Sequence, residues 1–83
     1  MSLTVVFRET ALRSLARVRS DDKEAFARIR RAIAVLADQP YPDAAIPWGG
    51  TGIFRLRAGE ARILYEVDDE ASIVYIINIG RIS

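Results

Sequence analysis

The chain has 83 residues, 51% of them hydrophobic, and a polypeptide of this length builds one core, so we expect a single domain over residues 1–83. It contains no cysteine and no histidine, which excludes disulfide bonds, thiolate or imidazole metal sites, and mechanisms that use either residue as nucleophile or base. Twelve Lys and Arg residues against eleven Asp and Glu residues give a net charge of +1, so only a local cluster of cations could attract a polyanion.

No apolar run in the sequence approaches the length that crosses a bilayer, and no charged-then-apolar leader begins the chain. We therefore expect a cytoplasmic protein with no membrane partner, no metal ion and no other cofactor. All cations except Lys23 are arginines, which suits forked contacts with phosphate but is also typical of genomes rich in G and C.

The first third of the chain predicts a strand followed by a short helix. Residues 3–7 are rich in β-branched and aromatic side chains, which favour a strand. From Glu9 onward the apolar residues recur at helical spacing, and the helix is expected to end at residues 20–21. Its inward-facing positions are predicted to be Ala11, Leu12, Leu15 and Val18.

A second amphipathic helix is predicted to follow at once. Asp21 and Glu24 have the spacing of a capping box at its start. The helix should stop at Gln39, because the residue before a proline is disfavoured in the helical conformation. Its inward-facing stripe consists of Phe26, Ile29, Ile33 and Leu36.

Residues 40–52 are expected to form an irregular connection, since they hold all three prolines and three of the five glycines. Trp48 lies in this segment. Two interpretations of Trp48 are open: it closes one end of the core, which we favour, or it stacks on a ligand.

Three further strands are predicted at residues 53–57, 61–67 and 72–79, joined by turns at 58–60 and 68–71. Because both connections are short, these strands should form an antiparallel meander. The predicted order is βααβββ, which is an α+β fold with a two-helix hairpin packed on one face of a small antiparallel sheet.

The turn at residues 58–60 decides which side chains share a face of the sheet. If Gly59 and Glu60 form a two-residue loop, Arg57 lies opposite Arg62 and Arg55 lies on the same face, away from the helices. Two like charges directly opposite each other cost about 0.2–1 kcal/mol. A sequence selected only for folding would avoid such a pair, which suggests a binding role.

The last strand is expected to add to this face. If Val67 lies opposite Ser72, then Tyr75 lies beside Leu64 and Arg81 continues on the same side, so that four arginines and a tyrosine converge. The alternative is purely structural. Arg55 would then pair diagonally with Glu66, and Glu60 would screen Arg62, leaving only surface ion pairs of little energetic value.

The same face is also predicted to be apolar, and the sequence has no third helix to cover it. An amphipathic helix or an extended segment of another chain is therefore expected to bind there. The alternative is a central, twisted strand whose outer face is covered by arginine side chains. The residues concerned are Leu64, Ile73, Tyr75, Ile77 and Ile79.

The second half of the chain resembles the RelE/ParE superfamily of bacterial toxins, and in particular its RelE-like branch. Residues 54–65 read Phe-Arg-Leu-Arg-Ala-Gly-Glu-Ala-Arg-Ile-Leu-Tyr, which fits the family pattern (Tyr/Phe)-Arg-Leu-Arg-x-Gly-x-x-Arg-x-x-Tyr. Residues 5–7 leading into 11–15, the helix end at 33–40 and the sequence Ile-Gly-Arg at 79–81 extend the resemblance over nearly the whole chain.

The resemblance implies a toxin of a type II toxin–antitoxin system whose antitoxin blocks the active face through Leu64, Ile73, Ile77 and Ile79, and which reaches operator DNA only through that antitoxin. In the RelE-like branch it also implies a metal-independent endoribonuclease that cleaves mRNA in the ribosomal A site and so inhibits translation. The RNA 2′-hydroxyl would attack the adjacent phosphorus.

Carried over by position, the resemblance implies RNA-binding roles for Arg55 and Arg57, a catalytic role for Arg62 and, as an approximate substitute for a later arginine of the family, a catalytic role for Arg81. Tyr75, which is expected on the same face, is predicted to bind RNA with them. Guanidinium groups suit the negative charge that grows on the phosphate in the transition state.

Two departures from the family pattern keep other functions open. In nucleases of this branch a further basic residue and a tyrosine follow the glycine–basic pair, whereas Ile82 and Ser83 stand here. The connecting loop also lacks the lysines common in the family. The alternatives are a ParE-like, non-enzymatic inhibitor of DNA gyrase, and a catalytically impaired toxin that acts as an antitoxin partner or co-repressor.

Overall fold

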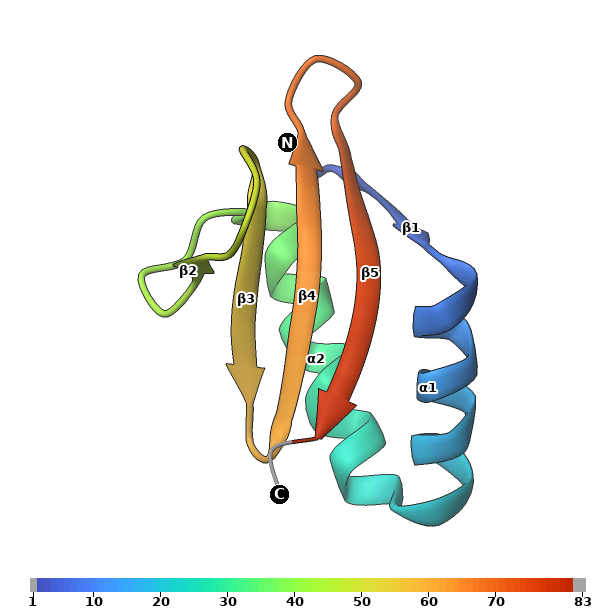
Figure 1. Ribbon diagram of the computed structural model, residues 1–83. Coiled ribbons are helices and arrows are strands. Elements are labelled where there is room, and N and C mark those ends of the chain that lie inside the picture. The colour runs from blue at the N-terminus through green and yellow to red at the C-terminus, as the bar shows by residue number, and fades with distance from the viewer. Residues whose placement is uncertain (1, 82–83) are drawn as a thin grey trace.

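The computed structural model describes residues 2–81, and these form two helices on one side of a curved sheet (Figure 1). The elements in chain order are β1 (Thr4–Phe7), α1 (Glu9–Asp21), α2 (Lys23–Asp38), β2 (Ile46–Pro47), β3 (Ile53–Ala58), β4 (Ala61–Asp68) and β5 (Ile73–Arg81). The predicted α+β class and its two-helix hairpin are confirmed.

The sheet has the strand order β1-β5-β4-β3-β2. The pairs β5–β4 and β4–β3 are antiparallel, as the short connections predicted. Strand β2, which lies in the segment expected to be irregular, pairs antiparallel with β3, and β1 runs parallel to β5. The sheet is therefore mixed rather than antiparallel. The direction of β1 escaped the sequence because its partner lies at the other end of the chain, with no tight turn between them to set the direction.

The helices cover one face of the sheet, with α2 behind β3 and β4 and α1 beside β5 (Figure 1). On α2 the predicted stripe is buried at Ile29, Ile33 and Leu36, which expose 1%, 6% and 0% of their surface, whereas its first residue, Phe26, is half-buried. On α1 the prediction for Leu12 is wrong, because Leu12 is 51% exposed whereas Ala11 is fully buried. Neighbouring helical residues point about 100° apart, and α1 is turned so that Ala11 faces the sheet and Leu12 faces away from it.

The N-cap of α2 is Asp22 rather than the expected Asp21. Helix α1 continues through Asp21, and Asp22 is extended, with its side chain accepting a hydrogen bond from the backbone N–H of Ala25 at 3.1 Å. A capping residue needs this extended conformation, which the sequence of two adjacent aspartates does not reveal.

Tyr65 on β4 links the sheet to the segment that follows α2 through a hydrogen bond to Pro40. The side chain is fully buried, its ring stacks on Phe54, and its hydroxyl donates to the backbone oxygen of Pro40 at 2.8 Å. Burial, and to a lesser extent the charge of Tyr41, raises the pKa of Tyr65 to about 12. Within residues 2–81, neither helix is long and apolar enough to span a membrane.

Candidate functional site

The turn between β3 and β4 places two arginines directly opposite each other. Gly59 has a φ of +64°, a left-handed conformation that glycine adopts without strain. Arg57 pairs across the strands with Arg62, and Arg55 pairs with Leu64, as the sequence predicted. We call Arg55, Arg57 and Arg62, which lie on the sheet face opposite the helices, the arginine face.

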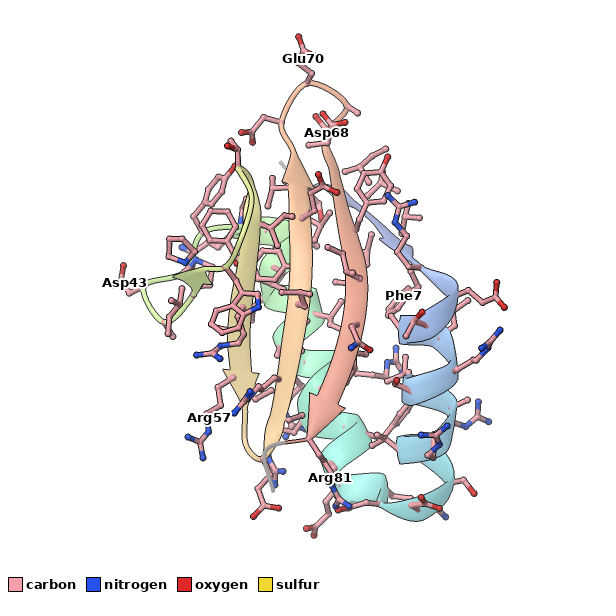
Figure 2. The ribbon with its side chains drawn as sticks, viewed as in Figure 1. Phe7, Asp43, Arg57, Asp68, Glu70 and Arg81 are labelled. Carbon is pink, nitrogen blue, oxygen red and sulfur yellow. The ribbon has the colours of Figure 1, made fainter. Side chains whose placement is uncertain are left out.

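The guanidinium groups of this face are differently exposed. Arg57 and Arg62 are exposed and Arg55 is half-buried, and the Nε of Arg57 donates to the backbone oxygen of Gly59 at 2.9 Å. In Figure 2 the side chain of Arg57 extends away from the sheet near the end of β3. These groups carry hydrogen-bond donors and positive charge but accept no proton at neutral pH, so the arrangement can bind and stabilise an anion.

The ion pairs proposed by the structural alternative do not form in the part of the chain that the structure describes. The ion pairs present there are Arg13–Glu9, and Arg81–Asp22 at 4.0 Å. Among residues 2–81, no carboxylate contacts the arginine face to neutralise its charges. The described residues also contain no group of three or more metal-ligating side chains that could hold a metal ion.

The pairing of β4 with β5 contradicts the expected register. Val67 lies opposite Val74 instead of Ser72, and Asp68 lies opposite Ile73. The cause is local: the Asp68 side chain accepts a hydrogen bond from the N–H of Ala71 at 3.0 Å and Ser72 is left-handed with a φ of 58°. The loop thus occupies residues 69–72 and shifts every later partner along the strand.

A β-bulge then reverses the facing of the end of β5. Leu64 pairs with Asn78 while Tyr65 pairs with Ile76, so Ile77 is an extra residue on β5. Beyond this point, positions expected to face away from the helices face toward them. Ile79 is 5% exposed and belongs to the core, so its assignment to the antitoxin-binding surface is wrong.

Arg81 is also displaced from the arginine face by the bulge. It lies opposite Ala61, whose side chain is buried on the helix side, and its Nη2 lies 4.0 Å from the Oδ2 of Asp22. Figure 2 places Arg81 by the turn between α1 and α2. The prediction that Arg81 converges with the other arginines is wrong, whereas its catalytic role, which the resemblance implied, stays a prediction.

Tyr75 faces away from the helices as expected, but its neighbours differ from those predicted. It lies opposite Glu66, and the guanidinium carbon of Arg8 lies 4.4 Å from its ring centroid. Arg62 lies opposite Gly80, five residues further along β5, which corresponds to about 16 Å. Tyr75 and the arginine face are therefore separate sites on one surface, and an RNA-binding role for Tyr75 stays a prediction.

Trp48 does not close the core, and our favoured interpretation of it is wrong. It is 47% exposed, and the guanidinium carbon of Arg55 lies 4.2 Å from its ring centroid. Strand β2 explains this position: Ile46 pairs with Arg55 and Pro47 pairs with Phe54, so alternation turns Trp48 to the side of Ile46 and Arg55. The sequence did carry a signal for this position: Ile46, Pro47 and Trp48 read as a short extended segment, in which Ile46 and Trp48 share one side.

The apolar surface on the side of the sheet away from the helices differs from the prediction: it loses Ile79 to the core and gains Val6 and Ile46. Leu64, Ile73 and Ile77 are half-buried on the side away from the helices. Val6 on β1 and Ile46 on β2 add exposed apolar area at the two edges of the sheet. The sequence did not reveal these edges, because strand order depends on pairing between distant segments.

The helix side has a cavity of about 240 Å³ between the α1–α2 turn and the ends of the strands. Its charged lining consists of Arg17, Asp21, Asp22, Arg28, Glu60 and Arg81. Three cations and three carboxylates balance there, so the cavity lacks the excess positive charge of the arginine face.

Comparisons with known proteins point to one superfamily. The family described as ParE toxin of type II toxin–antitoxin system, parDE, matches residues 5–83. No curated protein matches the sequence significantly.

Solved structures of this superfamily are similar over nearly the full chain. The toxin–antitoxin complex RelBE2 from Mycobacterium tuberculosis contains a chain with 28% identity and a TM-score of 0.80, covering 98% of this chain and 99% of that one. The archaeal RelE–RelB complex from Pyrococcus horikoshii gives 22% identity, a TM-score of 0.84 and coverage of 100% and 98%. The isolated Escherichia coli RelE toxin gives 20% identity, a TM-score of 0.84 and coverage of 99% and 86%.

Proposed function

This chain belongs to the ParE toxin family of type II toxin–antitoxin systems, and we propose that it acts by cleaving messenger RNA on the ribosome and is neutralised by a cognate antitoxin. The observation that carries the proposal is the cross-strand pair of Arg57 and Arg62, with Arg55 beside it, on the sheet face that no helix covers. Like charges held together without a contacting carboxylate favour a polyanionic ligand.

The chemistry requires few groups from the protein. The 2′-hydroxyl of the RNA attacks the neighbouring phosphorus and gives up its proton to water. The bond from phosphorus to the 5′-oxygen of the next nucleotide breaks, a 2′,3′-cyclic phosphate forms, and the leaving 5′-oxygen takes a proton from water. Negative charge accumulates on the phosphate oxygens in the transition state. Arg62 donates hydrogen bonds to those oxygens, whereas Arg55 and Arg57 hold the phosphates on either side. The ribosome supplies the orientation of the hydroxyl, which accounts for a face without a histidine or another neutral-pH base.

The antitoxin is proposed to cover the same face. Leu64, Ile73 and Ile77, together with the exposed edge residues Val6 and Ile46, provide an apolar surface for a segment of the partner. The RelBE2 and archaeal RelE chains are toxins crystallised with their antitoxins, which supports the same type of complex here. Binding there would bury the arginines and so block access of RNA. Any contact of the toxin with operator DNA is proposed to run through the antitoxin alone.

Cleavage of mRNA on programmed ribosomes by the purified toxin tests the proposal. Wild type should cleave within the A-site codon, and Arg62→Ala should be slower by roughly 10²–10³-fold, the usual cost of removing one donor to a developing oxyanion. Arg31→Ala, which removes an exposed arginine from α2, is the matched control and should cleave normally. Equal cleavage by wild type and Arg62→Ala would refute the proposed mechanism.

A second candidate is a non-enzymatic inhibitor of DNA gyrase. Two observations favour it: the matching family is that of ParE, and Arg81 does not join the arginine face. Inhibition of gyrase supercoiling, with no mRNA cleavage, would establish this alternative. Growth arrest on expression without the antitoxin separates both from a toxin that survives only as an antitoxin partner.

A further inference from the structure

The chain has one tryptophan, and the structure places it at the border of the arginine face. Trp48 exposes 47% of its surface, although large aromatic side chains are usually buried when they serve only the fold. Its ring lies 4.2 Å from the guanidinium carbon of Arg55, a distance at which the cation and the aromatic ring attract each other.

The backbone holds Trp48 in a tight turn rather than on a loose loop. The N–H of Trp48 donates to the backbone oxygen of Ile53 at 2.9 Å, and the N–H of Ile53 donates to that of Gly50 at 3.3 Å. Gly52 accepts from the N–H of Val67 at 3.0 Å, which ties the turn to β4. Gly49 and Gly52 have φ values of +85° and +79°, a conformation that other residues adopt only with strain. The backbone of Trp48 is therefore held in place, and the indole lies against Arg55.

An exposed aromatic ring beside a row of guanidinium groups is the arrangement with which proteins bind single-stranded nucleic acid. The unpaired bases stack on aromatic rings and on arginine planes, while cations hold the backbone. Arg55 and Arg57 are alternate residues of β3 and so lie about 7 Å apart along the strand on the same face. A nucleotide whose base lies on Trp48 would thus have its backbone within reach of both.

We propose that Trp48, with Arg55 packed against its ring, is a stacking platform for one unpaired base of the RNA, next to the phosphates held by Arg55, Arg57 and Arg62. This inference rests on the proposed ribonuclease function and adds to it a subsite that recognises a base rather than a phosphate. An RNA ligand fits the local charge better than a protein partner, because in the described chain the cation at the ring has no contacting carboxylate.

The test uses the tryptophan itself as the reporter. An RNA hexamer with 2′-O-methyl riboses cannot be cleaved by attack of the 2′-hydroxyl, and its binding is followed through the fluorescence of Trp48. A second hexamer of equal charge lacks its bases. Wild type should show quenching with the first hexamer and little with the second.

Variants separate stacking from other roles of the side chain. Trp48→Leu keeps an apolar group but removes the aromatic plane, and it should raise the Kd for the hexamer by about 5–100-fold, measured by competition with a labelled RNA. Trp48→Phe keeps a stacking surface and should change the Kd by only a few fold. Leu12→Ala, which alters an equally exposed apolar residue on α1, is the matched control and should bind as wild type. The same ranking is expected for mRNA cleavage on programmed ribosomes.

The outcomes distinguish this inference from the function on which it rests. If wild type cleaves mRNA and depends on Arg62, but Trp48→Leu cleaves and binds RNA equally well, the platform is refuted and the ribonuclease function stands. If Trp48→Leu weakens only the affinity for the antitoxin, the platform is refuted and Trp48 belongs to the protein interface. If wild type neither binds RNA nor cleaves mRNA, both proposals fail.

Discussion

Replacement of Arg62 by glutamine is expected to make the domain more stable and the toxin inactive. Arg62 lies directly opposite Arg57, is exposed, and has no contacting carboxylate in the described chain. If the two guanidinium groups separate to about 8 Å in water, their repulsion is about 0.5 kcal/mol by Coulomb's law, within the range of 0.2–1 kcal/mol typical of opposed like charges. Glutamine keeps a side chain of similar shape while removing that repulsion.

Thermal unfolding followed by circular dichroism measures the effect. A gain of about 0.5 kcal/mol raises the Tm of a domain of this size by roughly 2–4 °C. The increase should disappear at about 1 M salt, where the Debye length falls to about 3 Å. Arg31→Gln is the comparison variant, because it also changes the net charge from +1 to 0 but lies on α2, one turn from Arg28, rather than directly opposite an arginine across two strands.

The test combines the change in Tm with the activity in mRNA cleavage. A higher Tm together with loss of mRNA cleavage indicates that the arginine pair is retained for its ligand at the expense of stability. A lower Tm in Arg62→Gln would show that Arg62 stabilises the fold, and the argument from like charges would be refuted. An equal increase in Arg31→Gln would attribute the gain to net charge rather than to the pair.

Three further substitutions test the structural reasoning. Tyr65→Phe removes the buried hydroxyl and its hydrogen bond, and should lower the free energy of unfolding by about 1 kcal/mol in urea titrations at neutral pH. Tyr65 has a pKa of about 12 in the folded protein, whereas a tyrosine of the unfolded chain ionises near 10. Its contribution to the free energy of unfolding is therefore complete below pH 10 and is lost between pH 10 and 12. Tyr65→Phe should lack this alkaline loss. Asp22→Ala removes the N-cap of α2 and should cost about 1 kcal/mol, whereas Asp21→Ala should cost much less because Asp21 ends α1 and does not cap α2. Gly59→Ala should lower the Tm for two reasons: left-handed strain of about 1–2 kcal/mol, and the new Cβ, which would lie 2.6 Å from the Cδ of Arg28. Adding Arg28→Ala to the same chain should restore only the part of the loss that this close contact causes.

The sequence by itself determined those features that depend on neighbouring residues. Apolar spacing located both helices, and strict alternation on either side of the Gly59 turn set the register of β3 with β4. Since that turn contains so few residues, the pairing of Arg57 with Arg62 followed directly from it, and so did the facing of Arg55.

Tertiary structure alone decided the rest of the surface. The parallel pairing of β1 and the bulge opposite Leu64 arise from contacts between segments far apart in the chain, which local periodicity does not encode. One extra residue in β5 is enough to turn Ile79 into the core and Arg81 toward the helices, because side chains in a strand alternate between its two faces. The short strand β2 likewise carried Trp48 out of the core and onto Arg55. Local patterns thus specified the arginines, whereas long-range pairing specified what surrounds them.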